Sequence, residues 1–415
     1  MPGAATDSRP MNSRFPDGFL WGASTSSHQV EGGNRWNDWW ELEQSGRLPH
    51  RSGEACRHYE LYESDFDLAR SLGHNAHRLS IEWSRIETKP GEWNEEALEH
   101  YAAVIAALRK RQIEPVVTLH HFTNPAWFAH RGGWLQDDSP DLFARYVDVV
   151  AARLAPNVRF WLTINEPTVF VKHAYVTCDW PPCGGRSWRH AVTALRNLCR
   201  AHAVAYDVLH RYRTDLMVGI AHSAPYVTAC NPQSPLDRLA ARTRDFVLND
   251  LVFRLFGRPA HEVLDYIGIN YYARQIVRWG STPFKAMLFG SECKADHHES
   301  PRRFTSMGWE IHAPGLARVL KRLSRLGLPL IVTENGIATT DETARTQYLE
   351  DHLATLAQSV RDGVPVIGYL YWTLMDNYEW AKGFDAKFGL AAVDFTTQER
   401  RPRPAAQAFR ELIDR

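Results

Sequence analysis

Two glutamates stand where a pair of carboxyl groups could share one reaction. Glu166 ends the run RFWLTINE, and Glu334 lies in the run PLIVTEN, so each follows a short stretch of apolar, β-prone residues. Cleavage of a glycosidic bond needs one carboxylic acid to protonate the leaving oxygen and a second carboxylate to attack or stabilise the anomeric carbon. These two residues could supply both groups if the fold brings them into one pocket.

Each of the two motifs also has a simpler structural interpretation. In NEP, Pro167 is typical of the first position of a helix, and an acidic residue before it suits a helix N-terminus. In ENG, Asn335 and Gly336 are typical of a turn with positive φ. Either motif alone favours these interpretations, but two glutamates at equivalent places on two strands favour a catalytic pair. The separation of the two carboxyl groups, which decides between retention and inversion, does not follow from the sequence.

Short β-prone runs alternate with amphipathic segments along the chain. The expected strands are residues 19–25, 76–83, 114–121, 159–166, 217–223, 266–272, 329–335 and 366–372. Between them, apolar residues recur every three or four positions, as they do in helices packed on a core. This pattern predicts an α/β protein, a single (β/α)8 TIM barrel with elaborated loops at the C-terminal face, which is the active face of such barrels. No GxGxxG turn follows the first run, so nucleotide binding is disfavoured.

Composition indicates one domain rather than several. From Phe15 onward the chain has no Gly/Ser linker and no low-complexity tract. We therefore expect a flexible N-terminal segment at residues 1–14 and a barrel domain at residues 15–415. Residues 280–305 and 373–400 form segments too long for tight turns between strands and helices, and they are expected to build pocket walls.

Charge and cysteine usage exclude several classes of partner. Lys plus Arg and Asp plus Glu both number 48, so no net field attracts nucleic acid. The polar N-terminus lacks the apolar stretch of a signal peptide, and no apolar run is long enough to span a membrane, so a cytoplasmic protein is expected. The cysteines are thinly spread and interpreted as free thiols, and no metal or cofactor is expected. The sequence does not indicate the oligomeric state. The cysteines are Cys56, Cys178, Cys183, Cys199, Cys230 and Cys293.

Ordered motifs along almost the whole chain resemble those of glycoside hydrolase family 1, the β-glucosidase and β-galactosidase family. They are FLWGASTSSHQVEG, RLSIEWSRIE, TLHHFTNPAWF, TINEP, IGINYYA, MGWEI, VTENGIA and YWTLMDNYEWAKGFDAKFGL. The resemblance implies a retaining β-glycosidase that releases the terminal sugar of a small-molecule β-glycoside through a covalent glycosyl-enzyme. It implies that Glu166 is the acid/base and that Glu334 is the nucleophile.

The same resemblance implies supporting roles for four further residues. Arg78 and Tyr272 match the residues that keep the nucleophile ionised and hydrogen-bonded. Asn165 matches the residue that contacts the sugar 2-hydroxyl, and Asn270 is implied as a further support of the catalytic pair. The residues expected to bind substrate are Gln29, His121, Trp309, Trp372, Glu379, Trp380 and Phe388.

Three of these assignments depend on the motif rather than on residue type. The chain has 15 tryptophans, and most tryptophans pack in cores. Only motif position implies that Trp372 forms the floor under the sugar ring and that Trp309 lines the aglycone side. His120 and His121 are neighbours on an expected strand and should point to opposite sides, and the family pattern selects His121 for the pocket.

Departures from the family pattern leave the substrate open. Phe122 stands where many members have tryptophan, and the loop CDWPPCGGRSW carries cysteines where related sequences more often have glycine. Glucoside, galactoside and fucoside hydrolysis, tolerance of bulky aglycones, and transglycosylation all fit the same residues. A 6-phospho-β-glycosidase is one alternative, but Glu379 would repel a phosphate. A non-catalytic sugar-binding protein on the same fold is another, although both glutamates are intact.

Overall fold

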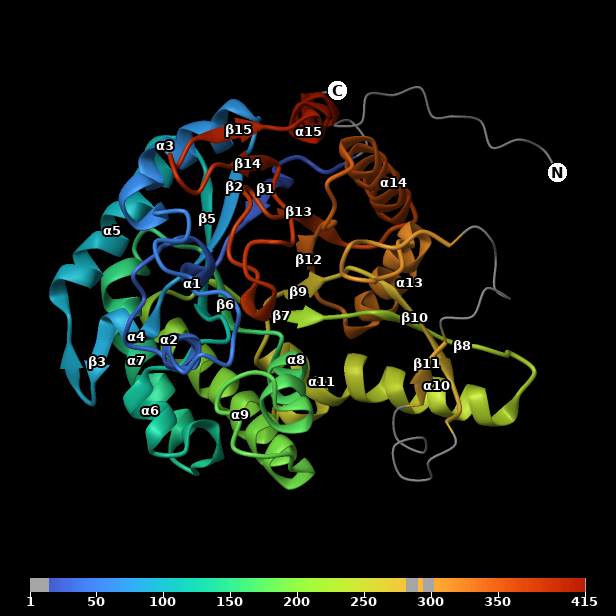
Figure 1. Cartoon of the computed structure of the whole chain (residues 1–415), viewed down its shortest axis with the longest axis horizontal. Coiled ribbons are helices and arrows are strands. Elements are labelled where there is room, and N and C mark those ends of the chain that lie inside the picture. The colour runs from blue at the N-terminus through green and yellow to red at the C-terminus, as the bar shows by residue number, and fades with distance from the viewer. Residues whose placement is uncertain (1–14, 281–289, 294–301, 415) are drawn as a thin grey trace.

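The predicted barrel is confirmed by the computed structural model, which describes residues 15–280, 290–293 and 302–414. Eight parallel strands close in the order β1-β13-β12-β9-β7-β6-β5-β2 (Figure 1). They are β1 (Leu20–Ser24), β2 (Ala76–Ser80), β5 (Glu114–His120), β6 (Phe160–Asn165), β7 (Met217–Ser223), β9 (Ile267–Asn270), β12 (Leu330–Asn335) and β13 (Val366–Trp372). Each lies within or matches one of the eight expected runs. The proposed flexible segment 1–14 lies outside the described residues, as does most of segment 280–305.

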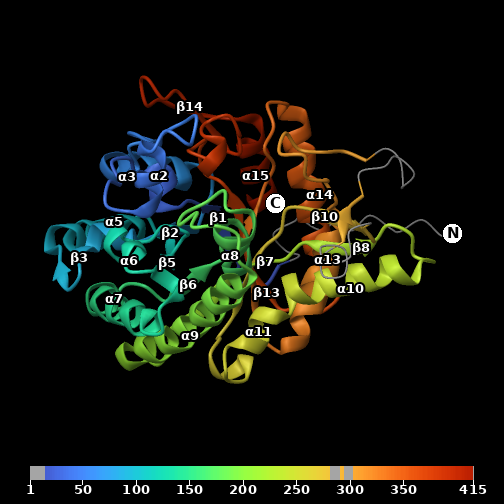
Figure 2. The ribbon, with the colours of Figure 1, turned by 60° about the horizontal axis from the view of Figure 1, so that its bottom comes forward.

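Amphipathic helices surround the strands, and α7 and α9 lie side by side in two views (Figures 1 and 2). In α5, buried Leu98, Tyr101, Ile105 and Leu108 recur at the helical spacing that faces a core. None of the helices within the described ranges has the length and apolarity needed to cross a membrane. The longer helices are α3 (His58–Ser71), α5 (Glu95–Lys110), α7 (Ser139–Leu154), α9 (Trp188–Tyr212), α10 (Pro235–Asn249), α13 (Ala313–Leu323), α14 (Glu342–Arg361) and α15 (Pro404–Asp414).

Short elements fill the loops that follow the barrel strands. A three-stranded sheet has the order β11-β10-β8, and β3 pairs with β4 and β14 with β15. The short strands are β3 (Glu87–Lys89), β4 (Glu92–Trp93), β8 (Tyr226–Ala229), β10 (Arg274–Arg278), β11 (Ser291–Glu292), β14 (Ala391–Val393) and β15 (Arg400–Pro402). The short helices are α1 (Ser27–Val30), α2 (Asp38–Gln44), α4 (Trp83–Ile86), α6 (Ala126–His130), α8 (Pro167–Val171), α11 (Leu251–Leu255), η2 (Gly133–Leu135), η3 (Lys172–Thr177), η4 (Ala260–Glu262), η5 (Ser324–Leu326) and η6 (Trp380–Lys382).

The barrel interior is divided between an apolar lower part and a polar upper part. A separate buried cluster contains side chains mostly from the early positions of the strands, including Leu20, Ala76, Val116, Phe160 and Ile331. This cluster closes the amino-terminal end of the barrel, as packed side chains do in such folds. Polar and charged side chains therefore gather at the carboxyl ends of the strands.

Two barrel strands contain one extra residue just before the residues expected to be catalytic. Leu162 pairs with Gly219 on β7, and Asn165 pairs with Ala221. Strand β6 therefore advances by three residues where β7 advances by two. Similarly, β12 advances from Val332 to Asn335 while β13 advances by two residues. Such bulges interrupt strict alternation and redirect the side chains that follow.

Of the two structural interpretations of the NEP and ENG motifs, the first is confirmed and the second is wrong. Helix α8 does begin at Pro167, with Glu166 in the left-handed region at φ 44°, so the helix-start interpretation is confirmed. The turn interpretation of ENG is wrong, because Asn335 ends β12 and neither it nor Gly336 has positive φ. Gly336 is instead needed for close packing, since a Cβ there would lie 1.9 Å from the carbonyl oxygen of Trp372.

Gly22 on β1 gives a test of the same constraint away from the catalytic residues. A Cβ at this position would lie 1.8 Å from the carbonyl oxygen of Ala76. Because backbone cannot move aside inside a closed barrel, we expect Gly22→Ala to lower the free energy of unfolding by about 1–3 kcal/mol. In denaturant unfolding, Gly184→Ala should have the same free energy of unfolding as the wild-type protein, because the added Cβ meets nothing within 4 Å. Equal unfolding midpoints for both variants would contradict this reading of the barrel.

Candidate active site

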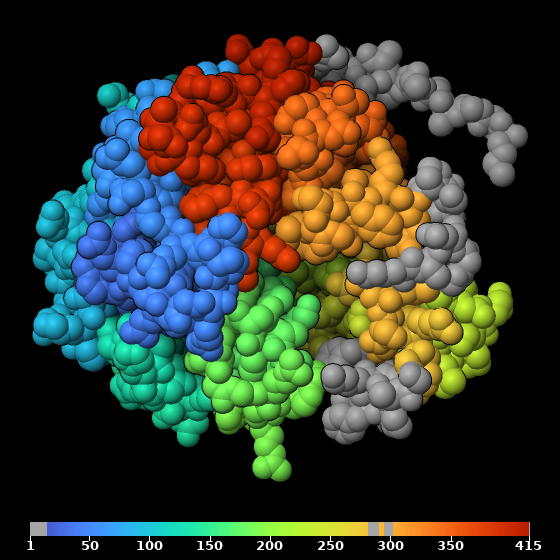
Figure 3. Space-filling view, viewed as in Figure 1, coloured from blue at the N-terminus to red at the C-terminus, as the bar shows by residue number. Residues whose placement is uncertain are grey.

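The expected site residues converge at the carboxyl ends of the barrel strands. Arg78 comes from β2, Asn165 and Glu166 from the end of β6, Asn270 from the end of β9 and Glu334 from β12. The loop after β13, coloured red-orange, and the green segment around α8 border a hollow near the middle of the molecule (Figure 3). The predicted wall segment 373–400 contains η6, which begins at Trp380 directly after Glu379.

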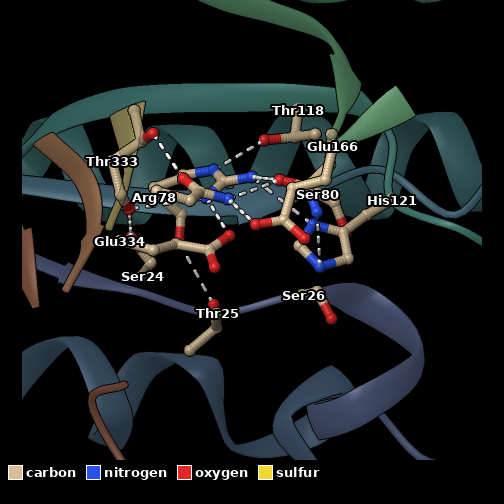
Figure 4. Close-up of polar contacts among 12 residues, drawn as sticks. Ser24, Thr25, Ser26, Arg78, Ser80, Thr118, His121, Glu166, Thr333 and Glu334 are labelled. Carbon is tan, nitrogen blue, oxygen red and sulfur yellow. Dashed lines mark hydrogen bonds and ion pairs between the residues drawn. The ribbon is translucent and has the colours of Figure 1, made fainter. Parts of the chain in front are cut away.

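Arg78 is fully buried, with 0% of its surface exposed, and its guanidinium is the centre of the polar network (Figure 4). Its Nη1 donates to the carboxylate of Glu334 and its Nη2 donates to Asn165 Oδ1 at 2.7 Å. Its Nε donates to Thr118 Oγ1 at 3.0 Å. A guanidinium presents five N–H donors in a planar fork, so one side chain can orient several residues at once.

Glu334 receives a hydroxyl donor as well as the guanidinium. Tyr272 Oη donates to Glu334 Oε2 at 2.6 Å. Burial, with the negative charge of Glu334 adding to it, raises the pKa of Tyr272 well above its usual value, so this hydroxyl stays protonated and remains a donor. The opposite charge and the hydroxyl bond both stabilise an ionised Glu334, which leaves it available as an attacking carboxylate.

Glu166 occupies a different electrostatic environment. Burial, with the negative charge of Glu334 adding to it, raises the pKa of Glu166 to about 8. Asn270 Nδ2 donates to Glu166 Oε1 at 2.9 Å and acts against this shift. Asn270 is in turn held by Thr333 Oγ1, which donates to its Oδ1 at 2.7 Å. Glu166 is therefore protonated at neutral pH, as a general acid must be.

Asn165 and His121 adjoin the catalytic pair from two neighbouring strands. Asn165 Nδ2 lies 3.4 Å from His121 Nε2, and His121 Nδ1 lies 3.4 Å from Arg78 Nη2. Burial and the positive charge of Arg78 lower the pKa of His121 well below its usual value, so the ring is neutral. His120 points elsewhere, because its Nε2 lies 3.0 Å from Asn124 Oδ1 and its ring packs against Trp134.

A second cluster of polar residues joins Gln29 of α1 to the loop after β13. Gln29 Nε2 donates to Glu379 Oε2 at 3.1 Å, to the carbonyl of Tyr378 at 2.8 Å and to Asn377 Oδ1 at 3.2 Å. Burial and the charge of Glu334 raise the pKa of Glu379 to about 8, with hydrogen bonds from Gln29 and Trp372 opposing the shift. Three carboxyl groups thus share one buried pocket, and mutual repulsion favours the protonated form of two of them.

Aromatic rings form the remaining surfaces of the pocket. His121 lies parallel to Trp372 at an interplanar angle of 9° and to Trp380 at 11°. Phe388 and Trp372 belong to one buried apolar cluster, against which Tyr272 and Trp309 pack. Aromatic faces of this kind stack against the apolar face of a sugar ring. The structure therefore brings together all the residues for which the sequence predicted a catalytic, supporting or substrate-binding role.

Several residues of this network were not predicted from the sequence. Thr118 and Thr333 hold Arg78 and Asn270, and Asn377 contacts Gln29. Each of them lies inside a quoted motif, in TLHH, VTENG and MDNYEW, and that position was the available signal. No group of three metal-ligating side chains converges anywhere in the described part of the chain.

The chain is similar to known proteins in sequence and in fold. The model of glycosyl hydrolase family 1 matches residues 11–258 and 258–415. Beta-glucosidase A of Thermotoga maritima is 30% identical over 432 residues, covering 93% of this chain and 95% of the relative. A beta-galactosidase of Pyrococcus woesei is 29% identical over 497 residues, covering 96% and 97%. A solved beta-glycosidase from Pyrococcus horikoshii has a TM-score of 0.89 and 41% identity, covering 98% of this chain and 95% of that chain.

The family match and the polar network point to the same kind of reaction. The match extends over nearly the full length, and the network contains two carboxyl groups in contrasting environments within one pocket. Both observations fit hydrolysis at an anomeric carbon. The chain belongs to glycosyl hydrolase family 1 and is a glycoside hydrolase that acts on β-glycosides.

Proposed function

We propose that the protein is a retaining β-glycosidase that releases the terminal non-reducing sugar from β-glucosides, and also from β-galactosides and β-fucosides, by double displacement. The observation that carries this proposal is the contrast between the two glutamates. Glu334 accepts bonds from a buried guanidinium and a hydroxyl, whereas burial and the charge of Glu334 keep Glu166 protonated. A protonated carboxyl group beside a carboxylate that is bound by a cation and a hydroxyl is what an acid and a nucleophile require.

In the first half of the reaction, Glu334 attacks the anomeric carbon while Glu166 transfers its proton to the glycosidic oxygen. A covalent bond then joins the sugar to Glu334, and the aglycone leaves as a neutral alcohol. Asn165, fixed by Arg78 Nη2 at 2.7 Å, is placed to bind the sugar 2-hydroxyl, an interaction that strengthens in the transition state.

In the second half, the roles of Glu166 reverse. Esterification removes the negative charge of Glu334, which is a cause of the raised pKa of Glu166, so the pKa of Glu166 falls and the group becomes a base. It takes a proton from water, which attacks the anomeric carbon and breaks its bond to Glu334. The sugar leaves with its original configuration, and Glu334 is again a carboxylate. An alcohol that replaces water at this stage gives transglycosylation.

Sugar hydroxyl groups are bound by the polar group around Glu379. A carboxyl oxygen and the Gln29 amide, 3.1 Å apart, offer an acceptor and a donor that suit neighbouring hydroxyls. His121 and Trp380 complete this subsite, Trp372 forms its floor, and Trp309 and Phe388 lie toward the aglycone. Relatives named beta-glucosidase and beta-galactosidase support hydrolysis of both sugars.

A 6-phospho-sugar fits this pocket poorly. Three carboxyl groups occupy it, those of Glu166, Glu334 and Glu379, and the guanidinium of Arg78 is bound to Glu334. A phosphate dianion beside Glu379 would meet a carboxyl group where it needs a cation. Sugar binding without catalysis would leave the contrast between the two glutamates without a role.

The proposed reaction is tested first by its product. Aryl β-glucoside, β-galactoside, β-fucoside and 6-phospho-β-glucoside are offered in parallel, and the released sugar is followed by NMR before mutarotation. We expect turnover of the unphosphorylated substrates with the β-anomer formed first. Initial release of the α-anomer would contradict the double displacement, and turnover of the 6-phosphoglucoside alone would contradict the sugar assignment.

Substitution separates the roles of the two glutamates. Glu334→Gln should abolish turnover of every substrate, because an amide does not displace the aglycone. In Glu166→Gln, kcat/KM, which reports only the first half of the reaction, should fall by about 10²–10⁴-fold for aryl glycosides with poor leaving groups. It should fall less for those with good leaving groups, because general acid catalysis matters most for poor ones. Glu99→Gln, exposed on α5, is the control. An equal loss of kcat/KM for all leaving groups in Glu166→Gln would refute the role of Glu166 as the acid.

The pH profile tests the electrostatics of Glu166. Because its pKa is about 8, kcat/KM should fall as the pH rises through about 8. Asn270→Ala removes a bond that favours the carboxylate, so the alkaline limb should move to higher pH. Glu379, whose own pKa is about 8, becomes negatively charged over the same pH range and then raises the pKa of Glu166. Glu379→Gln removes that charge, so the limb should move to lower pH. Profiles that move in the same direction, or not at all, would contradict this account.

A further inference from the structure

The chain turns sharply where β5 ends, and this turn carries two residues to the pocket. Phe122 has φ 73°, a left-handed conformation that a bulky residue adopts only when its surroundings enforce it. The Phe122 ring lies 4.8 Å from that of Trp180 and 5.4 Å from that of Trp380. His121, the residue before it, lies parallel to Trp372. Whatever fixes this turn therefore fixes part of the sugar subsite.

Asn124 anchors the turn to the start of helix α2. Its backbone N–H donates to Asp38 Oδ1 at 3.0 Å, and its Nδ2 donates to Asp38 Oδ2 at 2.8 Å. The backbone N–H of Asp38 donates back to the carbonyl of Asn124 at 3.0 Å. Both carboxylate oxygens of one buried aspartate, 5% exposed, are thus used by one residue of the turn.

The orientation of the Asn124 amide is determined by its other partner. Trp134 Nε1, which can only donate, lies 2.8 Å from Asn124 Oδ1. The oxygen of the amide therefore faces Trp134, and the NH₂ group faces Asp38. The next residue back is held as well, because Thr123 Oγ1 donates to Glu82 Oε2 at 2.9 Å. Both groups of Asn124 that meet Asp38 are therefore donors, so each oxygen of the Asp38 carboxylate must accept a hydrogen bond.

We propose that Asp38 is a positioning residue for sugar binding, whose ionised carboxylate, acting through Asn124, holds the turn that presents His121 and Phe122 to the substrate. The inference rests on the proposed glycosidase function and extends it to a residue that does not touch the substrate. Protonation of Asp38 would place an O–H against an N–H of Asn124 and remove one of the two acceptors. Sugar affinity then depends on the ionisation of a group outside the catalytic pair.

The surroundings of Asp38 place this ionisation near neutral pH. Burial raises the pKa of Asp38 to about 7, the negative charge of Glu82 adds to the shift, and the bonds from Asn124 and the charge of His28 oppose it. Tyr175 and Cys183 also lie close enough to Asp38 to interact with its charge. Because its pKa in the folded protein exceeds the ordinary value of 3.8, ionisation of Asp38 lowers stability as the pH rises from about 4 to 7.

The stability effect and the positioning effect have opposite signs, which makes them separable. A role in stability alone would leave the folded protein equally able to bind sugar at every pH, with a more stable fold at low pH. A positioning role weakens sugar binding at low pH, although the fold is then more stable. Affinity for an uncharged sugar mimic, measured between pH 5.5 and 7.5, therefore distinguishes the two.

The experiment measures calorimetric binding of an uncharged glucose-configured lactam to the wild-type protein, Asp38→Asn and Glu41→Gln. Glu41 lies on the same helix, is exposed, and pairs with His130 at 2.9 Å, so it provides a matched loss of charge. In the wild type and in Glu41→Gln, we expect the Kd to rise about tenfold as the pH falls across this range. In Asp38→Asn, the Kd should be raised throughout and independent of pH. A second variant, Asn124→Ala, should behave like Asp38→Asn.

Each result bears on one claim. A pH-independent Kd in the wild type, or an Asp38→Asn variant that behaves like Glu41→Gln, would overturn the role of Asp38. Turnover of 4-nitrophenyl β-glucoside is measured on the same wild-type sample. If that substrate is not cleaved while lactam binding depends on Asp38, the proposed hydrolysis fails and the positioning role stands.

Discussion

The positive charge of Arg78, buried inside the barrel, organises the polar end of the molecule. The guanidinium of Arg78 has no exposed surface, and a charge removed from water is tolerated only when it is paired and its donors are used. Glu334 supplies the opposite charge, and Asn165 and Thr118 accept further bonds. Neighbouring strands of the barrel are therefore held in the one arrangement that satisfies this side chain.

The chemistry depends on the same charge. Because Arg78 and Tyr272 stabilise an anionic Glu334, the pocket contains a fixed negative charge, and burial together with that charge keeps the neighbouring Glu166 protonated. A hydrophobic pocket alone would offer no partner to a carboxylate and would leave the site without a nucleophile. The barrel separates their properties by giving only one of them a cation.

Much of the fold and of the site could be predicted from the sequence. All eight strands follow from β-prone runs bounded by helical periodicity, and Glu166 and Glu334 follow from their positions at strand ends. The bulges in β6 and β12 could not be predicted, because they appear only when each strand is paired with its neighbour. The role of Gly336 was predicted wrongly for a similar reason, since the carbonyl of Trp372 that excludes a side chain comes from a distant part of the sequence. Thr118, Thr333 and Asp38 have ordinary local contexts, and only tertiary contacts reveal what they hold.

The extra residue in each of these two strands also bears on how the gene can change. Strand alternation has a period of two, so losing one codon between those for Leu162 and Asn165 would leave the strand pairing regular while moving the residues after it by one step. The side chain at the strand end would then turn from the pocket toward the helices. A single-codon deletion in this stretch would preserve the NEP motif in the sequence and yet remove its glutamate from the pocket. Presence of the motif in a sequence is therefore weaker evidence of activity than presence of the motif together with the length of the strand before it.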